Sequence, residues 1–260
     1  MEAVGTQEMK GISGSTVKMI AIIAMLIDHT AAVLLEHMIE AQHLSFSLTE
    51  SAPPIVILYF VMRIIGRLGF PIFIFLLIEG LEHTRNKWKY LLRLVIFALV
   101  SEIPFDFAFN LSREEIFSGK IIEFGYQNVF FTLAIGLLTV IGLQAISDAK
   151  WNMEIKVVMN IGITIAGMGL GFLLQTDYGA VGVLAIVMMY LFRQRKLLAT
   201  GMTCVILMAS SVLEISAFLV LWPIAYYNGR RGWNLKYVFY AFYPLHLLLL
   251  WGICLVTGII

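Results

Sequence analysis

The chain has 260 residues, of which 60% are hydrophobic and only 13% are charged. An ordinary soluble domain is about 25% charged, so this sequence has too few charged residues to cover a water-soluble core. The formal net charge is +1 and the basic residues are scattered between apolar stretches, which argues against a nucleic-acid-binding surface. The two cysteines, Cys204 and Cys254, lie within apolar stretches without metal-ligand spacing, so we expect neither a disulfide framework nor a metal site.

Nine apolar runs follow one another along the chain, and a transmembrane helix needs about 20 predominantly apolar residues. The predicted helices cover residues 17–38, 54–82, 90–110, 128–147, 156–175, 178–192, 197–211, 212–228 and 236–258. The segment before the first run is polar, and that run lacks the cleavage pattern of a signal peptide, so we expect it to stay in the membrane. The sequence therefore predicts an all-α, polytopic bundle that forms one transmembrane domain over residues 1–260.

The positions of lysine and arginine predict the orientation of this bundle, because cytoplasmic loops are enriched in both residues. With the N-terminus inside and nine crossings, 14 of the 18 basic residues lie at cytoplasmic ends. Two, Arg113 and Lys120, fall in the longest external loop, and two more, Arg63 and Arg67, fall within a predicted span. We therefore expect a cytoplasmic N-terminus and an external C-terminus.

The first predicted helix carries the pair Asp28-His29 about halfway along its length. An ionisable side chain at the bilayer centre costs about 2.5–3.5 kcal/mol, so its default interpretation is functional. Adjacent helical residues project about 100° apart, so Asp28 and His29 each need a partner on another helix. Lys18 lies on nearly the same face as His29, about 16 Å nearer the predicted cytoplasmic end.

The second predicted helix carries Arg63 and Arg67 one turn apart, so both guanidinium groups share a face. Pro71 cannot donate the backbone hydrogen bond to the carbonyl of Arg67 and clashes with it. We therefore expect the helix to kink or break there, and the freed backbone groups to face protein or a wet cavity. Paired arginines favour an anion site, since they bind phosphate and carboxylate bidentately.

Further ionisable groups lie within or near the ends of other apolar runs, and they are Glu79 with His83, Glu102 with Asp106, and His246. Each has a structural alternative, in which the charges pair inside the bundle and only fix how the helices pack. The same alternative exists for Arg63 and Arg67, with Asp28, Glu79 or Glu102 as partners. For His246 a packed, hydrogen-bonded histidine is the favoured interpretation. For the four groups at mid-depth in the first two helices, function is favoured, because packing alone does not require so many.

At these residues the chain resembles the TraX-type membrane acetyltransferases. The matching segments include KMIAIIAMLIDHTAAV at 18–33, MRIIGRLGFPIFIF at 62–75, the DYG at 177–179 and FYPLHL at 242–247. The resemblance covers nearly the whole chain, and the order IDH, RIIGRL-FPIF, FYPLHL is its most specific part. The family is similar to the wider acyltransferase-three superfamily, which has a basic residue and a histidine on its first helix and two arginines on a later one. Lys18 with His29, and Arg63 with Arg67, match those positions, with a lysine for the arginine and a wider arginine spacing.

The resemblance implies transfer of an acetyl group from acetyl-CoA to an acceptor amine, such as a peptide or pilin-like N-terminus, in the bacterial inner membrane. His29 would be the general base, Asp28 or Glu102 would hold its imidazolium, and Arg63 or Arg67 would stabilise the oxyanion. The donor phosphates would be bound by basic groups at the cytoplasmic mouth, which are Lys18, His83, Arg85 and Arg67. The expected partners are acetyl-CoA, a peptide or small-molecule acceptor and the lipid bilayer, without nucleic acid.

Two alternatives remain open at this point. The acceptor could be a hydroxyl group of a glycan or a small molecule, since fold-level likeness does not fix the substrate. A secondary transporter is the competing class, because transporters also use broken helices and buried charges. The lack of two mirrored halves and the odd number of predicted helices argue mildly against transport.

Overall fold

The computed structural model describes residues 11–49, 51–233 and 236–259, and for residues 236 and 237 only the backbone. Within these ranges the regular structure is helical and no β-strand forms. The elements are α1 (Gly14–Thr30), η1 (Ala31–Leu35), α2 (Glu36–Ala41), α3 (Pro54–Gly66), α4 (Gly69–Glu82), α5 (Lys87–Phe105), η2 (Asp106–Asn110), α6 (Arg113–Phe117), α7 (Val129–Asp148), α8 (Met153–Leu173), α9 (Gly179–Leu191), α10 (Lys196–Leu207), η3 (Val212–Val220), α11 (Leu221–Ala225) and α12 (Lys236–Thr257).

Two long helical segments are each interrupted once along their length. A π-helical stretch, η1, joins α1 to α2. A turn at Arg67 and Leu68 separates α3 from α4, so the predicted break beside the arginines is confirmed. Pro71 lies in the first turn of α4, where the missing N–H is tolerated.

Polar side chains mark where several helices begin. The side chain of Asn86 accepts a hydrogen bond from Lys89 N at 2.9 Å, and that of Asn152 accepts one from Ile155 N at 2.9 Å. Asn128 does the same at the start of α7, through Phe130 N at 3.0 Å. These side chains satisfy backbone donors that have no partner within the helix, which explains why α5, α7 and α8 begin where they do.

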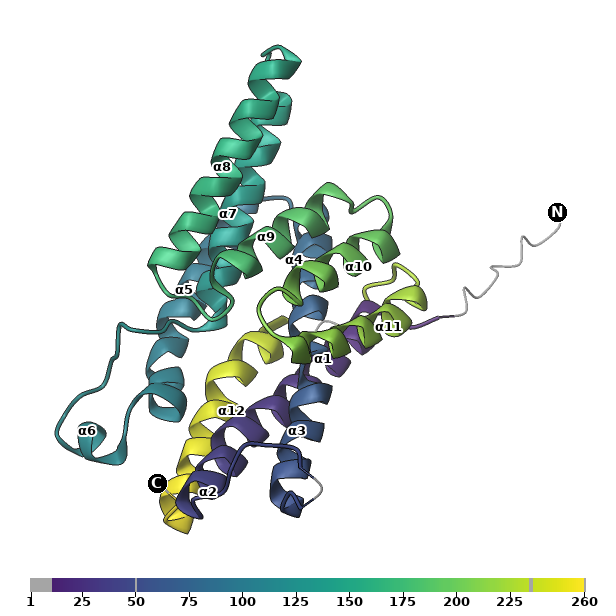
Figure 1. Cartoon of the computed structure of the whole chain (residues 1–260). Coiled ribbons are helices and arrows are strands. Elements are labelled where there is room, and N and C mark those ends of the chain that lie inside the picture. The colour runs from purple at the N-terminus through teal and green to yellow at the C-terminus, as the bar shows by residue number, and fades with distance from the viewer. Residues whose placement is uncertain (1–10, 50, 234–235, 260) are drawn as a thin grey trace.

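Helices α7, α8 and α9 pack against one another through glycines. A side chain at Gly167 would collide with Thr139, and one at Gly171 would collide with the backbone of Gly179, so the G-x-x-x-G pattern of α8 is used within the bundle. In Figure 1, α7 and α8 extend together beyond the other helices. Most of the apolar surface of α8 faces outward, since only 11% of its most apolar window is buried. This exposure is expected of a helix in contact with lipid.

Helices α1 and α12 run in the same direction. A backbone hydrogen bond of 2.7 Å joins Gly14 N, at the start of α1, to the carbonyl oxygen of Arg230, which precedes α12. Near the other end, the Cys254 thiol lies 3.7 Å from the carbonyl oxygen of Val33. The beginning of α1 and the end of α12 therefore lie at opposite ends of the bundle (Figure 1).

Five helical segments among the described residues are long and apolar enough to cross a membrane. They are Gly14–Ala41, Pro54–Glu82, Val129–Asp148, Met153–Leu173 and Val238–Thr257. Three shorter apolar segments, Gly179–Leu191, Lys196–Leu207 and Val212–Ala225, match the sixth, seventh and eighth predicted runs. A helix of 13 residues spans about 20 Å, which is less than the roughly 30 Å of a bilayer core. The number of nine spans and the orientation of the termini therefore stay predictions.

Candidate active site

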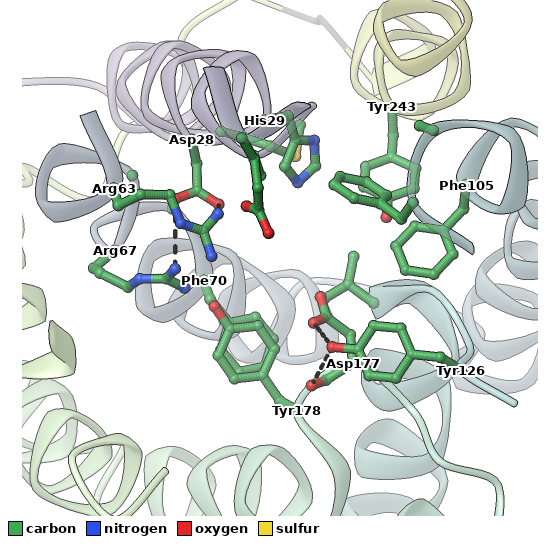
Figure 2. Close-up of a pocket in the computed structure, with 18 of the residues that line it drawn as sticks. Asp28, His29, Arg63, Arg67, Phe70, Phe105, Tyr126, Asp177, Tyr178 and Tyr243 are labelled. Carbon is green, nitrogen blue, oxygen red and sulfur yellow. Dashed lines mark hydrogen bonds and ion pairs between the residues drawn. The ribbon is translucent and has the colours of Figure 1, made fainter. Parts of the chain in front are cut away.

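A cavity of about 490 Å³, which we call the central cavity, lies between α1, α3, α4 and the segment around residues 177–178. It is lined by Asp28, His29, Arg63 and Arg67, the four mid-depth groups that the sequence singled out. Figure 2 shows these side chains converging on one space, opposite Tyr126, Asp177 and Tyr178. Its volume falls in the range of about 300–1,000 Å³ that is usual for ligand sites.

The carboxylate of Asp28 is bound by both arginines. Arg63 donates a hydrogen bond to it at 2.7 Å, and a terminal nitrogen of Arg67 lies 3.7 Å from its other oxygen. Arg67 also donates to Glu214 at 3.3 Å. Gly66 makes this cluster possible, because any Cβ there would collide with the Asp28 carboxylate. The structural alternative considered for the arginines is thus realised in part, since the cluster joins α1, α3 and η3.

Glu214 was not singled out by sequence reasoning, although it is a carboxylate within the predicted eighth helix and is 2% exposed. The cost of a buried charge, which selected the other candidates, applies equally to it. It joins Arg67 but does not line the central cavity.

The partner of the His29 ring is His246, on α12. The Nδ1 atom of His29 lies 2.7 Å from Nε2 of His246, and Nδ1 of His246 lies 2.7 Å from the carbonyl oxygen of Phe242. Phe109 and Tyr243 form T-shaped ring pairs with His29, with ring centroids 5.5 and 5.8 Å away. The expectation that Asp28 or Glu102 holds this ring is therefore not met in the structure.

Glu102 lies outside the central cavity, on the face of α5 that meets α7. Its carboxylate accepts a hydrogen bond from the side-chain amide of Asn128, which also donates to the carbonyl of Ala98 at 2.8 Å. Glu102 is 6% exposed, and its pairing with an α7 N-cap gives it a structural explanation. Its predicted place beside His29 is corrected accordingly.

Aromatic and polar groups form the wall opposite the arginines. Tyr178 stacks on Phe70 with ring centroids 3.5 Å apart, and in Figure 2 its hydroxyl points towards Arg67. The Tyr126 hydroxyl donates to the Asp177 carboxylate at 2.7 Å. Asp177 and Tyr178 belong to the DYG segment, one of the segments that carry the family resemblance. Sequence reasoning assigned this segment no role, and the structure places it in the cavity wall.

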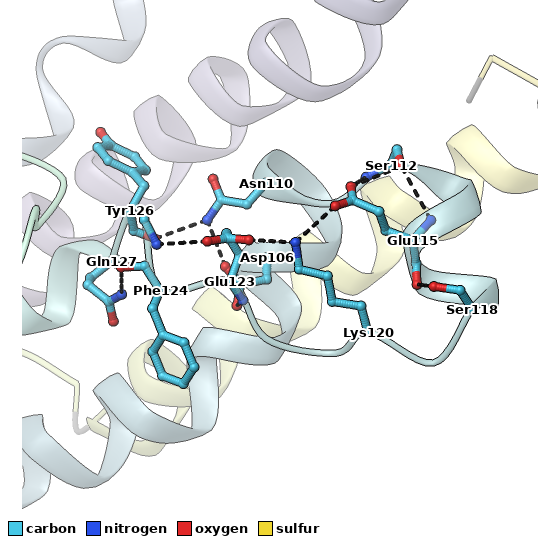
Figure 3. Close-up of polar contacts among 11 residues, drawn as sticks. Asp106, Asn110, Ser112, Glu115, Ser118, Lys120, Glu123, Phe124, Tyr126 and Gln127 are labelled. Atoms are coloured by element: carbon cyan, nitrogen blue, oxygen red, sulfur yellow. Dashed lines mark hydrogen bonds and ion pairs between the residues drawn. The ribbon is translucent and has the colours of Figure 1, made fainter.

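The loop between η2 and α7 is held at the rim of the central cavity by polar contacts (Figure 3). Asp106 accepts hydrogen bonds from the Asn110 side chain at 2.7 Å and from Glu123 N at 2.9 Å. Further out, Lys120 forms ion pairs with Glu115 at 2.9 Å and Glu123 at 2.6 Å. These contacts fix the position of the loop, which supplies Tyr126 to the cavity next to Asn110 at the end of η2.

The ion pairs of this loop shift the pKa values of the side chains that form them. Hydrogen bonds from Lys120 and then from Ser112 lower the pKa of Glu115 to about 2. The two carboxylates hold the pKa of Lys120 above its ordinary value, and Lys120 lowers the pKa of Glu123. All three groups are therefore charged at neutral pH.

A second cavity of about 520 Å³ lies near the beginning of α1 and the end of α4. We call it the basic cavity, because Lys18, His83, Arg93 and Arg231 line it together with Glu79. Arg85, predicted to bind the donor phosphates, is exposed and does not line this cavity. Arg67, predicted for the same role, lines the central cavity instead.

Phe73 lines both cavities, so its side chain lies between the two spaces. Lys18 in the basic cavity and His29 in the central cavity lie on the same helix, 11 residues or about 16 Å apart. Among the described residues no group of three or more His, Cys, Asp or Glu side chains is arranged to hold a metal ion. The arrangement brings together a histidine and a guanidinium pair in one cavity, and a basic cavity lies on the other side of Phe73.

Comparison with known proteins places the chain in a family. Residues 13–254 match the family model described as TraX protein. The chain is 30% identical over 258 residues to the probable fimbrial assembly protein FimC, serogroup H1, of Dichelobacter nodosus, which covers 92% of this chain and 94% of that protein. No solved structure matches the chain. The protein therefore belongs to the TraX family.

Proposed function

We propose that this protein is a membrane-embedded acetyltransferase that moves an acetyl group from acetyl-CoA to an acceptor amine, a peptide or pilin-like N-terminus. The observation that carries the proposal is that His29, Arg63 and Arg67 line one cavity, although they come from different helices. Membership of the TraX family and a relative named for fimbrial assembly support a pilin-like acceptor. The long apolar helices support a multi-pass location, which we propose to be the bacterial inner membrane.

The basic cavity suits the nucleotide end of the donor. Lys18, Arg231 and His83 line it, and such groups bind phosphates through charge-assisted hydrogen bonds. The donor's thioester arm would then pass Phe73 to reach the central cavity, where His29 lies. Arg67 is assigned to the reaction site in this scheme, and Arg85 is left at the outer surface of the donor site.

The chemistry is a direct transfer. The neutral amine attacks the thioester carbonyl carbon, a carbon–nitrogen bond forms, and His29 removes the proton that the nitrogen loses. The tetrahedral oxyanion collapses, the carbon–sulfur bond breaks, and the CoA thiolate takes the proton back from the imidazolium. The guanidinium groups of Arg63 and Arg67 would stabilise the oxyanion, and a site shielded from water makes such stabilisation more effective.

The rim of the central cavity supports an amine in preference to a hydroxyl. Glu36 and Glu40 line it, and their negative charge favours the approach of a protonated amine. A peptide α-amino group has an ordinary pKa of about 7.7–8.0, so part of it is already neutral near physiological pH. A neutral His29 can remove the proton released during attack from that fraction.

The test is acetyl transfer by the purified protein in lipid nanodiscs, with labelled acetyl-CoA and a pilin-like peptide. Parallel reactions use the same peptide with a blocked N-terminus and a hydroxyl acceptor. His29→Ala should lower the rate by about 10²–10⁴-fold, the usual contribution of a general base. His43→Asn is the matched control, because His43 is exposed and lies beyond the end of α2. Undiminished transfer by His29→Ala would refute the proposal.

A further inference from the structure

The His29 ring is the first member of a short hydrogen-bonded chain that ends on a backbone carbonyl. The chain runs from His29 Nδ1 to His246 Nε2, and from His246 Nδ1 to the oxygen of Phe242, with both separations 2.7 Å. The two imidazole planes are nearly parallel, at 7° to each other, with ring centroids 4.9 Å apart. His246 is 4% exposed and does not line the central cavity, so it lies behind His29 as viewed from that cavity.

The carbonyl oxygen determines where the protons are. A carbonyl can only accept, so His246 Nδ1 must carry a hydrogen and donate it to Phe242. A neutral imidazole has one N–H, so His246 Nε2 is then an acceptor, and the hydrogen between the rings belongs to His29 Nδ1. The Nε2 atom of His29 is consequently unprotonated. It has no hydrogen-bond partner among the described residues. It is also not one of the fully buried side-chain nitrogen and oxygen atoms that lack a partner.

We propose that His246 is a positioning residue that holds His29 in the Nδ1–H tautomer, with the Nε2 lone pair open to the central cavity. The inference rests on the proposed function only for its catalytic consequence. When His29 Nε2 takes a proton from the acceptor amine, the ring becomes cationic and its Nδ1–H bond to His246 becomes charge-assisted. Such bonds are about twice as strong as neutral ones, so His246 stabilises the imidazolium that the transfer step creates.

The surroundings hold His246 in one orientation. Phe242 stacks on its ring with centroids 4.6 Å apart, and Tyr243 makes a T-shaped contact with it, with centroids 5.8 Å apart. Both neighbours precede Pro244, which lies inside α12 and removes one backbone donor from this turn. A ring held on one face and one edge, with its Nδ1 hydrogen bonded to its own helix, presents a fixed acceptor to His29.

The tautomer can be measured without any substrate. The protein has five histidines, so ¹⁵N-histidine NMR in nanodiscs at about pH 8, above the ordinary histidine pKa of about 6.5, is assignable by single substitutions. We expect His29 to show a protonated Nδ1 and an unprotonated Nε2 in the wild type. His246→Leu should abolish this preference, whereas His246→Gln, whose side-chain oxygen can accept in place of Nε2, should retain it. A protonated Nε2 on wild-type His29, or an unchanged spectrum in His246→Leu, would overturn the inference.

Kinetics supply the second readout. His246→Leu should lower kcat on the order of 10–100-fold, as loss of an orienting partner does elsewhere, with KM for acetyl-CoA little changed, and His246→Gln should restore most of the loss. An equal rise in KM, or no rescue by glutamine, would indicate a purely structural role and overturn the inference. A wild type without acetyltransferase activity but with the expected tautomer would instead refute the proposed function alone. If His246→Leu does not fold, the wild-type spectrum and His246→Gln still decide the assignment.

Discussion

Replacing Asp28 by asparagine should destabilise the protein measurably, because the Asp28 carboxylate balances the positive charges of two arginines within the bundle. Removing one partner of a fully buried ion pair costs about 3–5 kcal/mol. Here the Asp28 and Arg63 side chains are 14% and 21% exposed, and asparagine still accepts one hydrogen bond, so we expect a loss nearer 2 kcal/mol. At about 2–4 °C per kcal/mol for a chain of comparable length, the Tm should fall by about 4–8 °C.

The assay is thermal denaturation in one detergent, followed by size-exclusion chromatography with intrinsic fluorescence. The double variant Asp28→Asn with Arg63→Gln should lose less than the sum of the single losses, by about 0.5–3 kcal/mol, because the unpaired cation has been removed. Glu36→Gln is the matched control, since Glu36 lies on the same helical segment and accepts from the neutral Tyr59 hydroxyl at 3.0 Å. An unchanged Tm for Asp28→Asn, or strictly additive losses, would refute the view that the cluster holds α1 and α3 together.

Three further outcomes follow from the structure. Gly66→Ala should lower the Tm or the folded yield, because its Cβ meets a carboxylate, whereas Gly162→Ala on α8 meets nothing within 4 Å and should be neutral in the same assay. Arg67→Lys should reduce acetyl transfer at least about tenfold, since an ammonium cannot reproduce the planar contacts of a guanidinium; wild-type activity would contradict this. The folded pKa of Glu115 is about 2, below its ordinary 4.5, so its contribution to holding the loop is fully present above about pH 4.5 and is lost as the pH falls through about 2. A ¹³C-glutamate NMR titration assigned with Glu115→Gln checks this, and an ordinary midpoint would refute it.

The sequence predicted those features that depend on the cost of burying charge or on local backbone chemistry. Pro71, which clashes with the carbonyl of Arg67, predicted the interruption there. The free-energy cost of charges in the middle of the membrane predicted that His29, Arg63 and Arg67 belong to one functional site. The structure places all three around one cavity. Apolar run lengths predicted the positions of the long helices to within a few residues.

The remainder required three-dimensional information. His29 and His246 are 217 residues apart in sequence, and no periodicity indicates that their rings meet. Glu102 was a candidate partner for His29 because both side chains are buried and ionisable. Its carboxylate instead accepts a hydrogen bond from Asn128, the N-cap residue of α7. Glu214 was overlooked although the same rule of buried charge selects it. Helix lengths alone also leave the short apolar segments in the C-terminal half unassigned as spans.

The most direct test of the central claim is a cryo-EM structure with a non-hydrolysable acetyl-CoA analogue. The account predicts phosphate density beside Lys18 in the basic cavity, a thioester arm passing Phe73, and an acyl carbon beside His29 Nε2, with room for an acceptor at a reactive separation of about 3–3.5 Å. A bound analogue whose acyl end lies outside the central cavity would contradict the claim that His29 and the arginine pair form the site of acetyl transfer.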